Sequence, residues 1–219
     1  NKYMKFAIIV FPGSNCDNDA FYALKNIGYD VEFVWHKNTA LSKFDGILIP
    51  GGFSYGDYLR TGAIAKFSPI MQSIIDESKK GKIIIGICNG FQILTQMGLL
   101  PGKLLLNDCK KFVCKKVKCN VSYETIQDYT ELYIANSYGK YVNNEKLKSD
   151  ECYFLRYEDK SIAGVCNKPK KIFGMMPHPE RNNLDFKNTF FQMLFYQEQM
   201  IEPNYQMIFD KSIKELMFS

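Results

Sequence analysis

The chain has 219 residues, 46% of them hydrophobic, and its 28 basic and 23 acidic residues give a formal net charge of +5. This length and composition suffice for one α/β domain with a buried core. The basic pairs are not interleaved with aromatic residues, so we expect no nucleic-acid partner. No apolar run approaches the roughly 18 residues of a membrane-spanning helix and no secretory leader is recognisable, so we expect no membrane contact and a cytoplasmic location.

The seven cysteines do not follow a metal-binding pattern. Cys109, Cys114 and Cys119 are spaced by five residues without a Cys-x-x-Cys pair, and the chain has only two histidines. Zinc sites usually combine closely spaced cysteine or histidine pairs. We therefore expect these cysteines to lie on the faces of strands and the chain to hold no metal.

Strand and helix patterns alternate through the first half of the chain. Short apolar runs bounded by turn residues predict buried strands over 6–11, 31–35, 47–49 and 83–87. Helical spacing of apolar residues predicts one helix that starts at an Asp17 cap and ends at Gly28, and another over about 68–79. This order predicts an α/β fold with a doubly wound, mostly parallel sheet of the flavodoxin-like type.

The second half of the chain has a different pattern. Strand-like segments around 104, 113–117, 131–135, 153–157, 162–165 and 172–175 follow one another without a long helix, which predicts a small antiparallel excursion that covers one edge of the sheet. A last helix is expected over about 184–199 and a short one over 208–218. No linker or repeat interrupts the chain, so we expect a single domain over residues 4–219.

Cys88 stands at the predicted junction between the fourth strand and the next helix. Its surroundings, Gly86-Ile-Cys-Asn-Gly90, have the form of a nucleophile elbow, in which glycines let two backbones approach while the side chain between them is held out. The amino end of the following helix could stabilise a thiolate and an oxyanion. The alternative interpretation is a buried structural cysteine.

A glycine-rich loop, Pro-Gly-Gly-Phe-Ser-Tyr-Gly-Asp over residues 50–57, follows the third strand. Loops at the carboxyl ends of parallel strands meet at one edge of the sheet, so we expect this loop to lie beside Cys88. Its three glycines favour close approach of the backbone to a ligand. The loop lacks the Gly-Lys-Ser/Thr ending of a Walker phosphate loop.

His178 and Glu180 are candidate partners for Cys88. They lie in Pro177-His-Pro-Glu180, where the two prolines favour an extended backbone and residues two apart point the same way. A carboxylate on one imidazole nitrogen would leave the other nitrogen to accept a thiol proton. The pattern predicts a Cys-His-Glu triad, with an ordinary surface turn as the alternative. His36 has no acidic residue placed in this way, and we interpret it as structural.

These motifs resemble those of the triad, or class I, glutamine amidotransferases. Within that family, residues 51–60 (Gly-Gly-Phe-Ser-Tyr-Gly-Asp-Tyr-Leu-Arg), 88–92 (Cys-Asn-Gly-Phe-Gln) and 175–181 (Met-Met-Pro-His-Pro-Glu-Arg) are most similar to the glutaminase subunits of phosphoribosylformylglycinamidine synthases, which act in purine biosynthesis. The likeness extends from residue 4 to about residue 199.

The resemblance implies a role for each residue. Cys88 would attack the side-chain amide of glutamine, with His178 as base and then acid and Glu180 as the group that orients its ring. The remaining roles would be an oxyanion hole from the backbone N–H groups of Gly52 and Asn89, and glutamine binding by Gly51, Phe53 and Gln92.

The resemblance also implies partners. Ammonia from glutamine would pass to a separate large synthetase subunit that converts formylglycinamide ribonucleotide to formylglycinamidine ribonucleotide, and a small bridging subunit is a further expected partner. This chain has no nucleotide loop, so we expect no cofactor on it, and ATP and Mg²⁺ on the synthetase.

One stretch departs from the family pattern. Relatives have Ala-His-Gly-Glu-Gly where this chain has Ala135-Asn-Ser-Tyr-Gly139, and the backbone there helps hold the α-groups of glutamine in relatives. Two alternatives therefore stay open: a catalytically weak or silent regulatory subunit of the same synthetase, and a class I glutaminase that serves another acceptor, as in guanylate or anthranilate synthesis. Asn89 and Phe91 at the elbow argue against the second.

Overall fold

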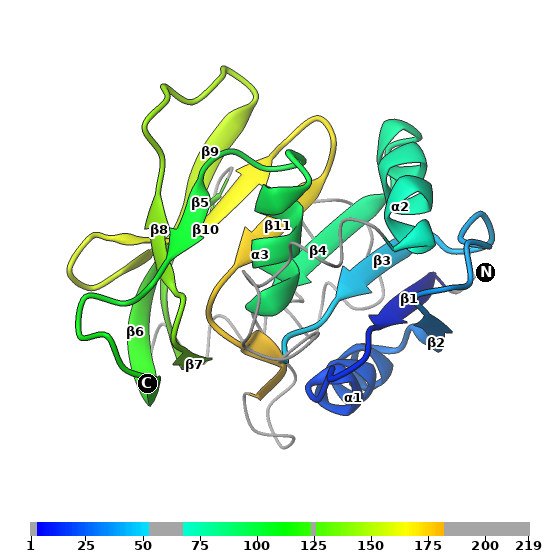
Figure 1. Cartoon of the computed structure of the whole chain (residues 1–219), viewed down its shortest axis with the longest axis horizontal. Helices are drawn as coiled ribbons and strands as arrows, with labels where there is room; N and C mark the ends of the chain where they lie inside the picture. Colours follow the sequence, from blue (N-terminus) through cyan, green and yellow to red (C-terminus); the bar gives the residue numbers. More distant parts are fainter. Residues whose placement is uncertain (1–3, 53–67, 124–125, 182–219) are drawn as a thin grey trace.

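The computed structural model describes residues 4–52, 68–123 and 126–181 (Figure 1). Most of the glycine-rich loop, including Phe53, lies outside these residues, as do the helices predicted over 184–199 and 208–218.

A single mixed sheet runs through the described residues (Figure 1). Its nine strands lie in the order β2-β1-β3-β4-β11-β10-β9-β6-β7. Their bounds are β1 Lys5–Val10, β2 Asp30–Trp35, β3 Gly46–Ile49, β4 Ile83–Ile87, β6 Val113–Tyr123, β7 Ile126–Asn136, β9 Glu151–Tyr157, β10 Ile162–Asn167 and β11 Ile172–Met175. A separate antiparallel pair joins β5 (Lys103–Leu105) to β8 (Lys140–Val142).

The first five strands in the sheet order are mutually parallel, and the alternating pattern predicts four of them, β1 to β4. The others are antiparallel to their neighbours, and they continue the sheet rather than cover its edge. The sequence also predicted that β11 belongs to the antiparallel group. β11 instead pairs in parallel with β4, with Gly174 opposite Gly86, and is antiparallel only to β10 on its other side. All four of its residues are buried, as is usual for a strand inside a parallel sheet.

Helices cover both faces of the parallel strands. Figure 1 shows α1 (Asp17–Ile27) on the opposite side of these strands from α2 (Pro69–Lys79) and α3 (Asn89–Gln96), as right-handed crossovers in both directions from β1 require. α1 ends at Gly28 in a left-handed conformation, as predicted. Its cap residue is Cys16, however, and Asp17 is the first helical residue, where its charge still favours the helix dipole.

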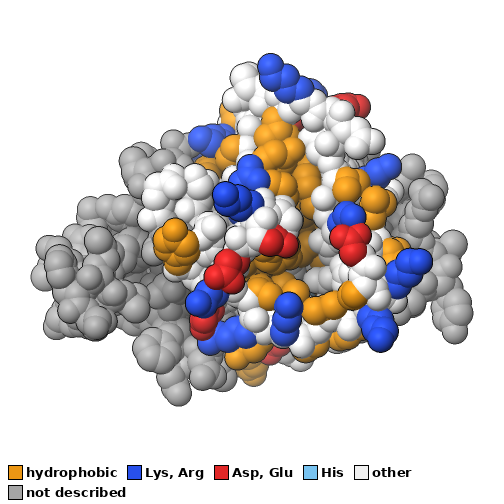
Figure 2. All heavy atoms as spheres, turned by 90° about the vertical axis from the view of Figure 1, so that its left-hand side faces the viewer, with side chains coloured by type: hydrophobic (Ala, Val, Ile, Leu, Met, Phe, Trp, Pro, Cys, Tyr) orange, Lys and Arg blue, Asp and Glu red, His pale blue; other side chains and the backbone are white. Residues whose placement is uncertain are grey.

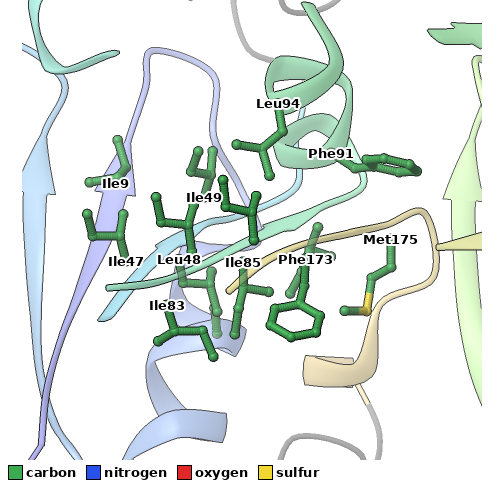
Figure 3. Close-up of a cluster of buried hydrophobic side chains, with 14 of the residues drawn as sticks. Ile9, Ile47, Leu48, Ile49, Ile83, Ile85, Phe91, Leu94, Phe173 and Met175 are labelled. Atoms are coloured by element: carbon green, nitrogen blue, oxygen red, sulfur yellow. The ribbon is translucent and has the colours of Figure 1, made fainter. Parts of the chain in front are cut away.

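The core lies on both faces of the parallel strands. Figure 3 shows Leu94 and Phe91 of α3 on one side of these strands and Ile83, Ile85 and Phe173 on the other. The labelled side chains are at most 1% exposed. Burial of this kind contributes roughly 1.5–3 kcal/mol per large apolar side chain, so apolar packing holds helices against both faces of these strands.

The antiparallel end of the sheet presents a different surface. Figure 2 shows hydrophobic side chains in a hollow among lysine and acidic side chains. This hollow, of about 870 Å³, is lined by residues of β6, β7 and β10 together with β8, and lysines 115, 116, 118 and 140 border it. None of the helices in the described residues is long and apolar enough to cross a membrane.

The turn from β4 into α3 passes very close to the end of β3. A methyl group on Gly90 would overlap the carbonyl oxygen of Ile49, and one on Gly86 would lie 2.6 Å from the carbonyl oxygen of Gly90. Glycine is therefore required at both ends of this corner because the backbones are in contact, as the elbow pattern predicts.

Replacement of Gly90 by alanine should destabilise the protein by about 1–3 kcal/mol or more, since the added methyl group has no space. Gln96→Ala, at an exposed position of the same helix, is the matched control and should stay within about 0.5 kcal/mol. Urea unfolding of both variants checks this. Equal stability of the two variants would contradict the packing described here.

Candidate active site

Cys88 occupies the corner between β4 and α3 in a strained conformation. Its φ of 52° and ψ of −106° are unusual for a residue with a side chain. Its N–H donates to the Met175 carbonyl at 2.7 Å, and its carbonyl accepts from the Gln92 N–H at 3.1 Å. The sulfur lies 3.7 Å from the Ala135 carbonyl at the end of β7. The side chain is therefore held at the carboxyl edge of the parallel strands.

His178 reaches the same edge from the end of β11. Its N–H donates to the Tyr133 carbonyl of β7 at 2.7 Å, and its ring Nδ1 lies 2.5 Å from Glu180 Oε1. Both side chains are almost fully buried, at 1% exposure each. The pairing confirms the proximity predicted from the sequence. The reason given for it is wrong, because Glu180 lies in a 3₁₀ turn (Pro179–Arg181) and not in an extended segment.

The charge of Glu180 governs the protonation of His178. Burial alone lowers the pKa of the imidazole, but the Glu180 charge and hydrogen bonding with Cys16, Cys88 and Glu180 together outweigh it. The pKa of His178 is therefore held well above its usual value of about 6.5. An imidazole in this environment can hold a proton that leaves the Cys88 sulfur.

A cavity of about 190 Å³ brings the two halves of the site together. Cys88, His178, Gly52 and Gln92 all line it. Gly51 packs beside it, because a methyl group there would lie 2.7 Å from His178 Cε1 and 3.2 Å from Cys88 Cβ. Any side chain at this position would displace the ring or the sulfur.

Of the other predicted site residues, Gly52 and Gln92 line the cavity and Asn89 is next to Cys88. Asn89 is the first residue of α3, where N–H groups point out of the amino end of the helix. Gly52 forms a bridge to Ser14 with a φ of 136°. Gln92 is buried, and its amide donates to the Tyr138 carbonyl at 2.8 Å, so it positions the segment after β7. Phe53 is outside the described residues.

The altered segment after β7 is held by a hydrogen-bond network. The amide of Asn107 donates to the carbonyl and side-chain oxygens of Asn136, at 2.9 and 3.2 Å, and its own oxygen accepts from the Gly139 N–H at 3.0 Å. Asn136, Ser137 and Tyr138 also line the cavity. The departure from the family pattern therefore lies at the site, in an ordered segment.

Two residues at the site were missed by the sequence analysis. Cys16 lies at the start of α1, and its sulfur accepts a hydrogen bond from Arg181 at 3.0 Å. Both residues line the cavity. Cys16 follows the carboxyl end of β1, so the edge rule that places the glycine-rich loop beside Cys88 could also have identified it.

The remaining histidine and cysteines agree only partly with the predictions. His36 is buried with its Nδ1 2.9 Å from Ser68 Oγ, which supports its interpretation as structural. Cys114 and Cys119 lie on β6, as expected, but Cys109 lies in the turn before it. Burial raises the pKa of the Cys119 thiol to about 12, so that thiol is unreactive at neutral pH.

Three comparisons with known proteins agree with one another. The profile of the CobB/CobQ-like glutamine amidotransferase domain matches residues 3–160. Phosphoribosylformylglycinamidine synthase subunit PurQ of Nostoc sp. (strain PCC 7120) is 42% identical over 81% of this chain and 88% of its own length, and the protein of that name from Koribacter versatilis is 43% identical over 81% and 89%. A chain in the structure of PurLQS from Thermotoga maritima is 38% identical, with a TM-score of 0.80 over 90% of this chain and 100% of that one.

Replacement of Glu180 by glutamine should lower the pKa of His178, because the charge that stabilises the imidazolium is removed. NMR titration of the imidazole signals checks this, with His36, the only other histidine, as an internal control that should not shift.

The raised pKa of His178 in the folded state also makes stability depend on pH. Its stabilising contribution is complete below about pH 6.5 and is lost as the pH rises through the folded-state pKa. The variant should therefore lose less stability above pH 6.5 than the parent, and identical titrations of His178 would contradict the assignment.

Proposed function

We propose that this chain hydrolyses glutamine and delivers the ammonia to a synthetase. The chain belongs to the CobB/CobQ-like glutamine amidotransferases and, within them, to the family of PurQ subunits of phosphoribosylformylglycinamidine synthase. The observation that carries the proposal is the convergence of Cys88 and the His178–Glu180 pair on one small, largely buried cavity. These groups come from opposite halves of the chain, and a glutamine side chain is of a size that such a cavity can admit.

In the first half of the reaction, the Cys88 sulfur, whose proton has already passed to His178, attacks the carboxamide carbon of glutamine. The oxygen of the tetrahedral intermediate becomes negative, and the N–H groups of Gly52 and Asn89 stabilise it. His178 then gives its proton to the leaving nitrogen, so that the C–N bond breaks and ammonia departs. This leaves a glutamyl thioester on Cys88.

In the second half, His178 takes a proton from water as the water attacks the thioester carbon. The C–S bond breaks, glutamate leaves, and the proton stays on His178 beside the freed sulfur, as at the start. Glu180 keeps Nδ1 occupied throughout, at 2.5 Å, so the other ring nitrogen, Nε2, exchanges every proton.

Substrate binding is assigned to groups that border the cavity. Gly51 lets the backbone of the glycine-rich loop lie against His178 and Cys88, and Gln92 holds the Tyr138 carbonyl at the cavity wall. Phe53 would complete the site from the glycine-rich loop. The segment over residues 135–139 supplies backbone groups for the α-amino and α-carboxyl groups.

The partners follow from the family. The solved relative is a PurLQS assembly, so we assign a large PurL synthetase and a small PurS subunit as partners of this chain in forming formylglycinamidine ribonucleotide. ATP and Mg²⁺ belong to the synthetase, and no cofactor is assigned to this chain. The site lies within residues 4–219, which we treat as one glutamine amidotransferase type 1 domain acting in the cytoplasm.

One alternative is kept by a specific observation. The segment Asn136 to Tyr138 differs from the usual family residues and lines the cavity, so a weak or silent regulatory subunit of the same synthetase is the second candidate function. The ordered triad favours the active enzyme.

Replacement of Cys88 by alanine should abolish glutamine-dependent synthesis by the reconstituted complex and leave ammonia-dependent synthesis unchanged, because only the nucleophile is lost. Steady-state assays with glutamine and with ammonium chloride check this. Exposed Cys109→Ala is the matched control and should keep both activities. Full glutamine-dependent synthesis by the Cys88 variant would contradict the proposal, and absence of it in the parent complex would favour the regulatory alternative.

The isolated chain should hydrolyse glutamine slowly, and addition of the synthetase with its nucleotide substrate should accelerate it. Uncoupled turnover would waste glutamine. Ammonia release by the chain alone and in the complex measures the ratio, and rapid turnover without the partner would contradict this expectation.

A further inference from the structure

Cys16 gives the cavity a second thiol that the proposed reaction does not use. Its sulfur, a ring nitrogen of His178 and a carboxylate oxygen of Glu180 all lie within 4.8 Å of one another. Cys88 lines the same cavity as Cys16 and His178. Two thiols and one imidazole therefore face one small, largely buried space.

The imidazole is oriented as a metal-binding histidine would be. Its Nδ1 is held by Glu180, so Nε2 points away from that carboxylate, and Nε2 is buried without a hydrogen bond of normal geometry within the described part of the chain. Metal-bound histidines usually have this arrangement, in which a carboxylate on the second nitrogen fixes the ring and raises its basicity.

We propose that Cys16, Cys88 and His178 form a binding site for a thiophilic divalent cation of the Zn²⁺ class. Two sulfurs and one imidazole nitrogen are a ligand set that Zn²⁺ and Cd²⁺ prefer to Mg²⁺ or Ca²⁺, and a water molecule could complete a tetrahedron. Zinc–sulfur and zinc–nitrogen bonds of ordinary length place the sulfur about 3.5 Å from the nitrogen. The Cys16 sulfur and a ring nitrogen of His178 lie within 4.8 Å of each other, so this pair needs a contraction of about 1 Å, and Cys88 lines the same cavity.

The charges around the site are compatible with a cation. The Glu180 carboxylate lies behind the ring, and each thiol that binds the metal, like the imidazolium of His178, gives up its proton to solvent. Arg181 opposes binding, because its guanidinium donates to the Cys16 sulfur at 3.0 Å. The sulfur keeps further lone pairs, so the metal and Arg181 can share it.

Occupation of this site would inhibit the enzyme. A metal-bound Cys88 sulfur cannot attack an amide, and a metal on Nε2 blocks proton transfer by His178. The metal site rests on the coordinates alone, whereas inhibition also rests on the proposed function of Cys88.

The test compares the full-length parent with Cys16→Ser and with Cys109→Ser, whose thiol is exposed and outside the cavity. Serine is a good helix cap, so the Cys16 variant should keep α1. Cd²⁺ binding is followed in a titration by the thiolate-to-metal charge-transfer absorption. The Kd of the strongest site should rise at least about tenfold in Cys16→Ser, because loss of a metal ligand weakens binding at least as much as loss of a group that hydrogen-bonds to a ligand. It should show no change in Cys109→Ser.

Zn²⁺ should also protect Cys16 and Cys88 from iodoacetamide, as peptide mass spectrometry can measure. In the reconstituted complex, Zn²⁺ should suppress glutamine-dependent synthesis, and a chelator should restore it. Ammonia-dependent synthesis should be unaffected by Zn²⁺. Each variant is compared with its own zinc-free rate.

Unchanged Cd²⁺ affinity in Cys16→Ser, or undiminished alkylation of Cys16 with Zn²⁺ bound, would overturn the metal site and leave the proposed function untouched. Binding and protection without loss of glutamine-dependent synthesis would support the site and count against Cys88 as the nucleophile.

Discussion

The site depends on the tight turn between β4 and α3. Cys88 holds a φ of 52° there, a conformation that costs about 1–3 kcal/mol and persists only where the surrounding structure requires it. The requirement comes from both sides of the corner: the Cys88 N–H bonds to Met175, and Gly90 packs on the backbone of Ile49. The strained turn thus directs one sulfur toward the edge of the sheet where the loops converge.

The order of strands in the sheet brings His178 to the turn that holds Cys88. β11 lies next to β4 and parallel to it, so the segment after β11 ends at the same edge as Cys88. The bridge from His178 to Tyr133 of β7 then fixes the imidazole from the antiparallel half. Burial alone would keep this ring neutral, and the Glu180 charge reverses that preference. The arrangement of Cys88, His178 and Glu180 is therefore a product of strand order as much as of local sequence.

Local patterns predicted the parallel half and the elbow because each depends on neighbouring residues: apolar runs for strands, and glycines where backbones touch. The placement of β11 could not be predicted in this way, since strand pairing between distant segments leaves little local signal.

The three-residue β8 was missed because so short a strand has no readable alternation. The turn at Pro179–Arg181 was misjudged because proline fits the first position of a helical turn as well as an extended segment. Cys16 was missed for lack of a motif.

The proposed reaction requires a covalent bond between the Cys88 sulfur and the substrate. Rapid acid quenching of the complex during turnover, followed by peptide mass spectrometry, would detect it. We expect the Cys88 peptide to gain the mass of glutamine less ammonia, and hydroxylamine to remove this label as expected for a thioester. A complex that turns over glutamine with the label absent, or attached to another residue, would rule out Cys88 as the nucleophile.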